Sequence, residues 1–262
     1  QPLRLIWSEI DYSTLSLLGT GVTFLSFLFL LPSWMEVRWS ERSPWIFLGI
    51  NSLRKTQIIK SLLKGLSISL CLITLVLTPL FLGPWVQEIS FISRFSLINA
   101  IVLGLGVGIA EELLFRGWLF TEMSKLLGHR LGILIQAIIF SLAHIRFKLD
   151  LIELIPLLVG LFLLGIVLAI RRIIDQGSLW GSIGIHGGLV GIWFAINSGL
   201  IKFASNTPSW LIGPGDHAPN PIGGLVAILA LIYILYHYRK AFSRAGRFSR
   251  ATFSASSKGA TP

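Results

Sequence analysis

The segment from Leu97 to Phe120 decides the fold class of this chain, and it reads LINAIVLGLGVGIAEELLFRGWLF. It is long and apolar enough to cross a bilayer, which takes about 20 residues of α-helix. Two adjacent carboxylates, Glu111 and Glu112, lie within it, and Arg116 follows one helical turn later. An ionisable side chain at the centre of a bilayer costs about 2.5–3.5 kcal/mol, so charged residues at this depth indicate a functional site.

The composition of the whole chain is typical of a membrane protein. Of its 262 residues, 53% are hydrophobic and only 13% are charged, whereas a soluble domain has about 25% charged residues. The net charge is +10, but the basic residues lie between and beyond the apolar runs, where Lys and Arg set topology and contact lipid headgroups. We therefore expect a lipid bilayer as a partner, and no nucleic acid. The single cysteine, Cys71, excludes a disulfide framework and a thiolate metal cluster.

Seven apolar runs predict membrane-spanning helices, so the expected fold class is all-α, a polytopic transmembrane helix bundle of about seven to eight spans. An eighth span would be a helix that precedes Gln1. The two runs between Leu131 and Ile170 could instead form a re-entrant pair, but the charged residues between them favour an interfacial turn. The predicted spans are Ser13–Leu31, Gly65–Leu82, Leu97–Phe120, Leu131–Ile145, Leu151–Ile170, Ser178–Leu200 and Ile222–Tyr238.

The spans divide the chain into four regions. Residues 1–96 hold the N-terminal spans and a basic cytoplasmic loop, and residues 97–200 form the core that carries the buried charges. Residues 201–242 contain an outer loop with several prolines and the last span. Residues 243–262 are rich in Ser, Gly, Ala and Arg, a composition that predicts a disordered basic tail.

The distribution of Lys and Arg predicts the orientation of the bundle. Most of them lie in the loop between Leu31 and Gly65, in later loops on the same side, and in the C-terminal tail. Because cytoplasmic loops are enriched in Lys and Arg, this pattern places the C-terminus in the cytoplasm. We expect an integral membrane protein of a bacterial plasma membrane, although a thylakoid or plastid membrane would give the same composition.

Helix geometry gives the two glutamates different partners. Glu112 and Arg116 are four residues apart, about 40° around an α-helix, and we expect them to form a structural ion pair. Glu111 points about 140° away from Arg116, so it needs a partner from another span. The two adjacent carboxylates are therefore expected to do different things.

Two histidines on other predicted spans come to similar depths. At about 1.5 Å of rise per residue, Glu111, His186 and His144 lie roughly 13, 12 and 20 Å from the cytoplasmic ends of their spans. A site with one carboxylate and two imidazoles supports two chemistries. Glu111 could activate a water directly, while the histidines orient that water or stabilise an oxyanion. Alternatively, all three could be ligands of a catalytic zinc, so the expected cofactor is either none or zinc.

Three motifs follow one another along the core: EExxxR from Glu111 to Arg116, FxxxH from Phe140 to His144, and then His186. In these motifs the chain resembles the CAAX-protease and bacteriocin-processing family (CPBP, or Abi) of intramembrane proteases. The resemblance implies a helix bundle around a water-filled cavity that opens to the cytoplasm and to the membrane. Members of the family are described as metalloproteases, and a metal-free glutamate mechanism is also held for them.

The resemblance also implies a role for each site residue. Glu111 would activate the water with the help of His144, and His186 would help to stabilise the oxyanion. The adjacent ion pair would be structural, and Phe140 would support the site. The implied function is that of an intramembrane endopeptidase, a hydrolase that cleaves a membrane-associated protein or peptide.

One position departs from the family pattern. Four residues after its last histidine the family usually has Asn or Asp, and this chain has Val190. Because a polar member of the family's site is missing, a second hypothesis stays open, that of a non-catalytic membrane scaffold or immunity-type protein of the same family. A third hypothesis is a transporter or proton pathway that uses the same buried charges, but the sequence has no inverted repeat to favour it.

Overall fold

The computed structural model describes residues 12–50, 54–215 and 218–256, without the side chains of residues 12–18, 20 and 244–256. The chain forms two compact units, Gln1–Phe47 and Leu48–Pro262. The first unit contains the helices α1 (Tyr12–Trp39) and α2 (Pro44–Phe47). The predicted span Ser13–Leu31 falls within α1, and part of it lies among the side chains outside the described residues.

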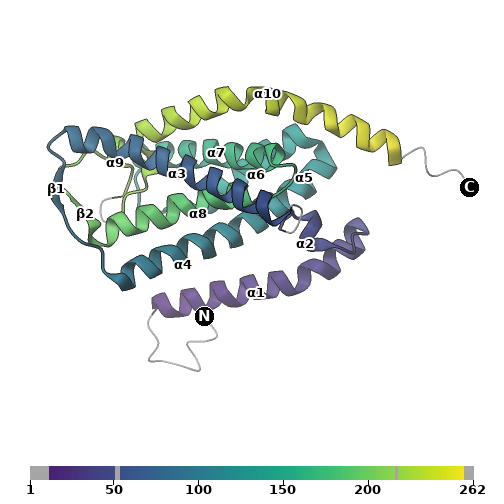
Figure 1. Cartoon of the computed structure of the whole chain (residues 1–262), viewed down its shortest axis with the longest axis horizontal. Coiled ribbons are helices and arrows are strands. Elements are labelled where there is room, and N and C mark those ends of the chain that lie inside the picture. The colour runs from purple at the N-terminus through teal and green to yellow at the C-terminus, as the bar shows by residue number, and fades with distance from the viewer. Residues whose placement is uncertain (1–11, 51–53, 216–217, 257–262) are drawn as a thin grey trace, which may run out of the picture. The chain divides into compact units, whose positions relative to one another are not determined.

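The second unit holds most of the helices and all the predicted site residues (Figure 1). Its elements, in chain order, are α3 (Lys55–Leu82), β1 (Val86–Ile89), α4 (Arg94–Glu111), the π-helix η2 (Glu112–Leu119), α5 (Phe120–Leu127), α6 (His129–Ala143), α7 (Leu151–Ile174), α8 (Trp180–Ala195), the π-helix η3 (Ile196–Leu200), β2 (Ile201–Phe203), α9 (Ser209–Ile212), the 3₁₀-helix η4 (Pro221–Gly223) and α10 (Leu225–Ser256).

The helical membrane character of the chain agrees with the sequence prediction, although the number of spans does not follow from the structure. Within the described residues, five helices are long and apolar enough to cross a membrane: Lys55–Leu82, Arg94–Leu127, Leu151–Ile174, Trp180–Leu200 and Leu225–Ser243. Helix α6 is apolar but shorter. The count of seven to eight spans therefore stays a prediction.

The lipid-facing and core-facing sides of these helices are distinct. Side chains such as Leu63, Ile101 and Leu229 are more than half exposed, which suits hydrocarbon and would be unfavourable over so large a surface in water. The fully buried apolar residues instead come together between α3, α7, α8 and α10. Leu157 and Leu231 are two of them.

A two-stranded antiparallel sheet is the one departure from an all-helical fold within the described residues. It pairs β1 with β2, so that Val86 lies opposite Phe203 and Ile89 opposite Ile201. β-Branched residues favour strands, but the two strands are far apart in the sequence, so local propensity could not predict their pairing. The sheet joins the connection after α3 to the connection after α8.

The last helix extends beyond the predicted last span. Helix α10 continues through Ser256, into the region 243–262 that was assigned to a disordered tail, and that assignment stays a prediction. The stretch from Leu225 to Ser256 has no proline and is rich in Ala, Leu and Arg, which are strong helix formers. Residues 257–262 lie outside the described residues.

Helix α8 packs between α3 and α4 through glycines (Figure 1). A Cβ atom on Gly104 of α4 would lie 2.6 Å from the carbonyl oxygen of Gly187 on α8, and one on Gly187 would lie 2.5 Å from the carbonyl oxygen of Gly104. On the opposite side, a Cβ atom on Gly65 of α3 would lie 2.2 Å from the carbonyl oxygen of Gly181. Small residues allow this close approach of helix backbones in lipid, and it brings the end of α4 against the middle of α8.

Gly104→Ala is expected to destabilise the protein by about 1–3 kcal/mol, because the added methyl group would overlap the backbone of α8 and force the two helices apart. Equilibrium unfolding in detergent–lipid mixed micelles measures this loss. The matched control is Gly106→Ala on the same helix, where nothing lies within 4 Å of the added Cβ atom. The explanation is wrong if the two variants lose stability equally.

Candidate active site

The backbone changes from an α-helix to a π-helix where the two glutamates meet. Helix α4 ends at Glu111, and Glu112 begins η2. At the other end of η2 the N–H group of Phe120 donates to the carbonyl oxygen of Phe115, five residues earlier, as a π-helix requires. Such π-turns are rare and occur frequently at functional sites. The sequence predicts a continuous α-helix here, because apolar periodicity does not reveal a π-turn.

Glu112 joins two buried partners. Its Oε1 atom accepts a hydrogen bond from Nη1 of Arg116 at 2.8 Å and lies 2.8 Å from Nδ1 of His186. Glu112 and Arg116 have no exposed surface, and His186 is 5% exposed. The predicted ion pair is therefore present, and it also holds His186, a contact that the sequence did not predict because α8 lies far along the chain.

Glu111 faces both histidines, and on His186 it approaches the ring nitrogen that Glu112 does not contact. Its Oε2 atom lies 3.3 Å from Nε2 of His144 and 3.9 Å from Nε2 of His186. The structure thus brings together the three side chains that the depth argument placed at similar levels. The side chains of Glu111 and His144 are 28% and 29% exposed, whereas the ion pair beside them is sealed. A substrate or a water molecule can therefore reach the Glu111–His144 edge of the site.

The contacts of the two Nδ1 atoms fix the tautomer of each imidazole, and so determine whether the Nε2 atom that faces Glu111 carries a hydrogen. Nδ1 of His144 lies 2.7 Å from the carbonyl oxygen of Phe140, which can only accept, so this nitrogen carries a hydrogen. Nδ1 of His186 carries one for the same reason, because it faces the carboxylate of Glu112. In a neutral ring the remaining Nε2 atom is an acceptor. Both Nε2 atoms face Glu111.

Phe140 packs the site from behind. Its ring lies 4.6 Å from the ring of His144 and 5.7 Å from that of His186, measured between centroids. The guanidinium carbon of Arg116 lies 4.0 Å from the same ring centre, an arrangement in which a cation is attracted to the face of the ring. Phe140 has no exposed surface. Its ring therefore contacts the guanidinium of the buried ion pair as well as both imidazoles.

Two residues near the site were not assigned a role there by sequence reasoning. Arg171 and Arg172 of α7 were assigned to the cytoplasmic surface charge, yet they are only 6% and 7% exposed. Arg172 contacts the backbone of η2. No signal in the sequence distinguished them from surface arginines, because both follow an apolar run, as topology-setting residues do.

Val190, the position that departs from the family pattern, lies close to His186 along the same helix. Val190 lies on α8, one turn beyond His186, and is half-buried. Asn197 is the next amide side chain along the chain, but it belongs to η3, where its Nδ2 atom donates to the carbonyl oxygen of Trp193. Neither residue gives the site an amide donor.

The zinc alternative finds no support in the arrangement of the side chains. No group of three His, Cys, Asp or Glu residues within the described part of the chain is arranged to hold a metal ion. The Nε2 atoms of the two predicted histidine ligands both face a single oxygen of Glu111, at 3.3 and 3.9 Å.

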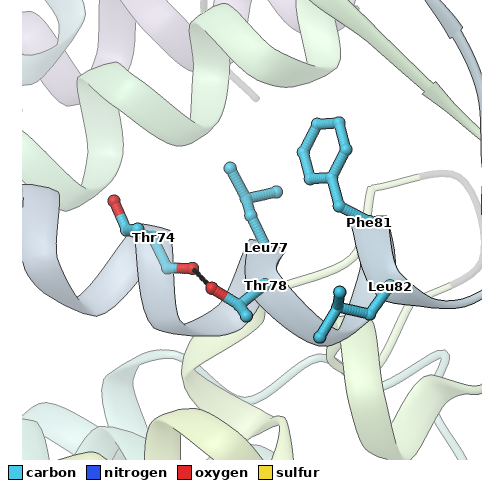
Figure 2. Close-up of a pocket in the computed structure, with 5 residues that line it drawn as sticks. All are labelled: Thr74, Leu77, Thr78, Phe81 and Leu82. Carbon is cyan, nitrogen blue, oxygen red and sulfur yellow. Dashed lines mark hydrogen bonds between the residues drawn. The ribbon is translucent and has the colours of Figure 1, made fainter.

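A separate pocket lies on α3 (Figure 2). It has a volume of about 320 Å³ and is lined by Thr74, Leu77, Thr78, Phe81 and Leu82. The hydroxyl group of Thr78 donates to the carbonyl oxygen of Thr74 at 2.7 Å, so it is already used within the helix. None of the predicted site residues lines this pocket, and its lining carries no titratable side chain.

Comparison with known protein families finds two matches. Residues 93–192 match the family described as type II CAAX prenyl endopeptidase Rce1-like. Residues 1–43 match a family described as a domain of unknown function (DUF8676). No curated protein and no solved structure matches the chain. The first match contains the EExxxR and FxxxH motifs and all three side chains of the site, Glu111, His144 and His186.

Proposed function

We propose that this chain, which carries in residues 93–192 a domain of the Rce1-like CAAX protease family, is an intramembrane endopeptidase that hydrolyses a peptide bond with a water activated by Glu111. Membership of a protease family and the membrane-spanning helices support the general function. The residue roles below are our inference from the geometry.

One observation carries the proposal: the environment of Glu111 Oε2. This atom is shielded from solvent and makes no hydrogen bond within the described residues, although two imidazole nitrogens lie 3.3 and 3.9 Å from it. Buried polar atoms are nearly always satisfied, and exceptions occur at catalytic sites. The oxygen therefore has unused hydrogen-bonding capacity, and a carboxylate that accepts from a water entering at the exposed edge of the Glu111 side chain is placed to take its proton.

The reaction follows from these contacts. Glu111 takes a proton from a water while the water oxygen adds to the carbonyl carbon of the substrate, and the carbonyl oxygen becomes an oxyanion. His186 can donate to that oxyanion when its Nε2 atom carries a proton. When the C=O bond re-forms, the C–N bond breaks, and the proton on Glu111 passes to the leaving amine. The products are a peptide with a new carboxylate and a peptide with a new amine.

His144 assists Glu111 in this scheme. Because Nδ1 of His144 is engaged by the carbonyl oxygen of Phe140, its Nε2 atom and the carboxylate of Glu111 are both acceptors unless a proton lies between them. His144 can therefore hold a proton at Nε2 and orient the carboxylate, or accept a hydrogen bond from the attacking water. Both tasks require His144 to lie beside Glu111 at the solvent-exposed edge of the site, and the structure places its side chain there.

The substrate class and the orientation belong to the same proposal. We infer a membrane-associated protein or peptide as the substrate, because the site lies on helices that are apolar enough to span a bilayer. The description of the matching family names a CAAX prenyl endopeptidase, so prenylated peptides belong in any substrate panel. We place the C-terminus in the cytoplasm by the positive-inside rule, in a bacterial plasma membrane.

The test is cleavage of labelled membrane peptides and prenylated CAAX peptides by the purified full chain in proteoliposomes. His144→Ala is expected to lower kcat/KM by about 10²–10⁴-fold, the usual range for a residue that moves or holds a proton. The matched control is His237→Ala, which removes an exposed imidazole on α10 and should leave cleavage unchanged. A zinc chelator is added in a parallel series, and cleavage should persist.

Each outcome separates the alternatives. Full activity of His144→Ala would contradict the role of His144, and loss of wild-type activity with the chelator would replace the metal-free scheme with a zinc site. If the wild type cleaves no peptide in a broad panel, the protease proposal fails. Val190 would then point to the non-catalytic scaffold.

A further inference from the structure

We propose that Arg172 is a positioning residue, which holds η2 in the backbone conformation that presents Glu111 to His144 and His186. The kinetic consequence of this inference rests on the proposed function, but the structural consequence does not. Arg172 lies in the last turn of α7, on a different part of the chain from the acidic motif. Its hydrogen bonds to carbonyl groups of η2 and to the hydroxyl group of Thr121 act on the segment that follows Glu111.

The contacts of Arg172 converge on the second half of η2 and the start of α5. Its Nη1 atom donates to the carbonyl oxygen of Arg116, to that of Gly117 at 3.4 Å, and to the hydroxyl oxygen of Thr121 at 3.0 Å. The Thr121 hydroxyl in turn donates to the carbonyl oxygen of Gly117 at 2.6 Å. A single guanidinium nitrogen therefore meets a cluster of three acceptors on one face of the segment.

The other end of the guanidinium is anchored on α7 and the turn that follows it. Nε of Arg172 donates to the carbonyl oxygen of Gly177 at 3.1 Å, and the N–H group of Gly177 donates back to the carbonyl oxygen of Arg172 at 2.8 Å. Gly177 has a φ of 92°, a conformation that glycine adopts without strain. The planar guanidinium thus bridges a turn after α7 and the π-segment with fixed geometry.

A π-turn needs such external support. Its hydrogen bonds span five residues instead of four, and this arrangement is rare because it is less favourable than an α-helix. A buried cation that donates to carbonyl groups of the segment compensates part of that cost, since charge-assisted hydrogen bonds are stronger than neutral ones. The charge of Glu112, the first residue of η2, also attracts Arg172. Both effects favour the π-helical conformation of the segment that begins directly after Glu111.

The neighbouring arginine provides a matched control. Arg171 is equally buried and lies on the same turn of α7. Its guanidinium forms a two-pronged ion pair with Asp175, with N–O distances of 2.9 and 2.7 Å. Loss of Arg171 therefore removes a buried arginine of the same helix without removing the contacts to η2.

The first measurement is hydrogen–deuterium exchange of the full chain in proteoliposomes, compared between wild type, Arg172→Gln and Arg171→Gln. Backbone amides of residues 111–121 are expected to exchange faster in Arg172→Gln, because the segment opens locally more often, and to stay protected in Arg171→Gln. Unchanged protection of this segment in Arg172→Gln overturns the proposal. Equal loss of amide protection in both variants also overturns the proposal, since it would show that any buried arginine of this turn has the same effect on the segment. If Arg172→Gln does not fold, Arg172→Lys takes its place, because Lys keeps the charge but loses the rigid bridge.

The second measurement is steady-state kinetics on any substrate that the wild type cleaves. Arg172→Gln is expected to lower kcat by up to about 100-fold with an unchanged KM, as misplacement of a catalytic group by about 1 Å does. Arg172→Lys should recover part of kcat, whereas Arg171→Gln should retain it. An unchanged kcat despite faster exchange overturns the positioning role. If the wild type cleaves nothing while the exchange pattern is as expected, Arg172 still supports η2 and the proposed protease function fails.

Discussion

Glu111→Gln is expected to lower kcat/KM by about 10²–10⁴-fold while the protein stays folded. The amide keeps the size of the side chain but cannot take a proton from water, so the general base is lost. Folding should survive because Glu111 is more than a quarter exposed and has no hydrogen-bonded partner at Oε2 within the described residues. Proteoliposome cleavage assays with a peptide substrate measure the loss.

The control for this variant is Glu88→Gln. Glu88 is an exposed glutamate on β1, far along the chain from the site residues, so the same chemical change there should leave cleavage unaltered. Equilibrium unfolding should also give the same stability for Glu111→Gln and the wild type. Normal turnover by Glu111→Gln would remove Glu111 as the base, and with it the mechanism.

Glu112→Gln, unlike Glu111→Gln, is expected to lower the free energy of unfolding, by about 3–5 kcal/mol. The change leaves the Arg116 guanidinium buried without its counter-charge, and an unpaired buried charge is far more costly than the pair. Two donors of Arg116 already lack a hydrogen-bond partner within the described residues, so the 2.8 Å bond to Glu112 is its main compensation. Equilibrium unfolding in mixed micelles measures the free energy.

A double variant isolates the pair. Glu112→Gln combined with Arg116→Met should cost less than the sum of the two single changes, because the second change removes the orphaned charge. The control is Glu36→Gln, which breaks an ion pair with Arg42 whose side chains are 65% and 90% exposed; it should leave stability almost unchanged. Additive effects at positions 112 and 116 would show that the buried pair is not coupled.

These two expected results reflect different roles for the two glutamates, one in catalysis and one in stability. Glu111 and Glu112 are neighbours in sequence, yet one lies at an exposed edge and the other has no exposed surface. The buried carboxylate contacts Arg116 and His186, whereas in the mechanism that we propose the exposed one receives the water. Function should therefore follow residue 111, and folding should follow residue 112.

The sequence by itself determined the class of the molecule and the identity of its polar centre. Apolar runs of membrane length predict helices, because unpaired backbone groups cannot be left in hydrocarbon. A charged motif inside such a run predicts a site, because isolated charges are costly there. The four-residue spacing of Glu112 and Arg116 predicted their ion pair, since both residues lie on one face of one helix.

Only the tertiary structure decided how the parts meet. The approach of α4 to α8 through Gly104 and Gly187 sets the distance between Glu111 and His186, and it depends on contacts between segments far apart in the chain. The π-turn at Glu112 and the bridge from Arg172 were not readable from periodicity, because neither changes the apolar pattern. Local rules assign residues to helices, whereas packing selects which of their side chains face one another.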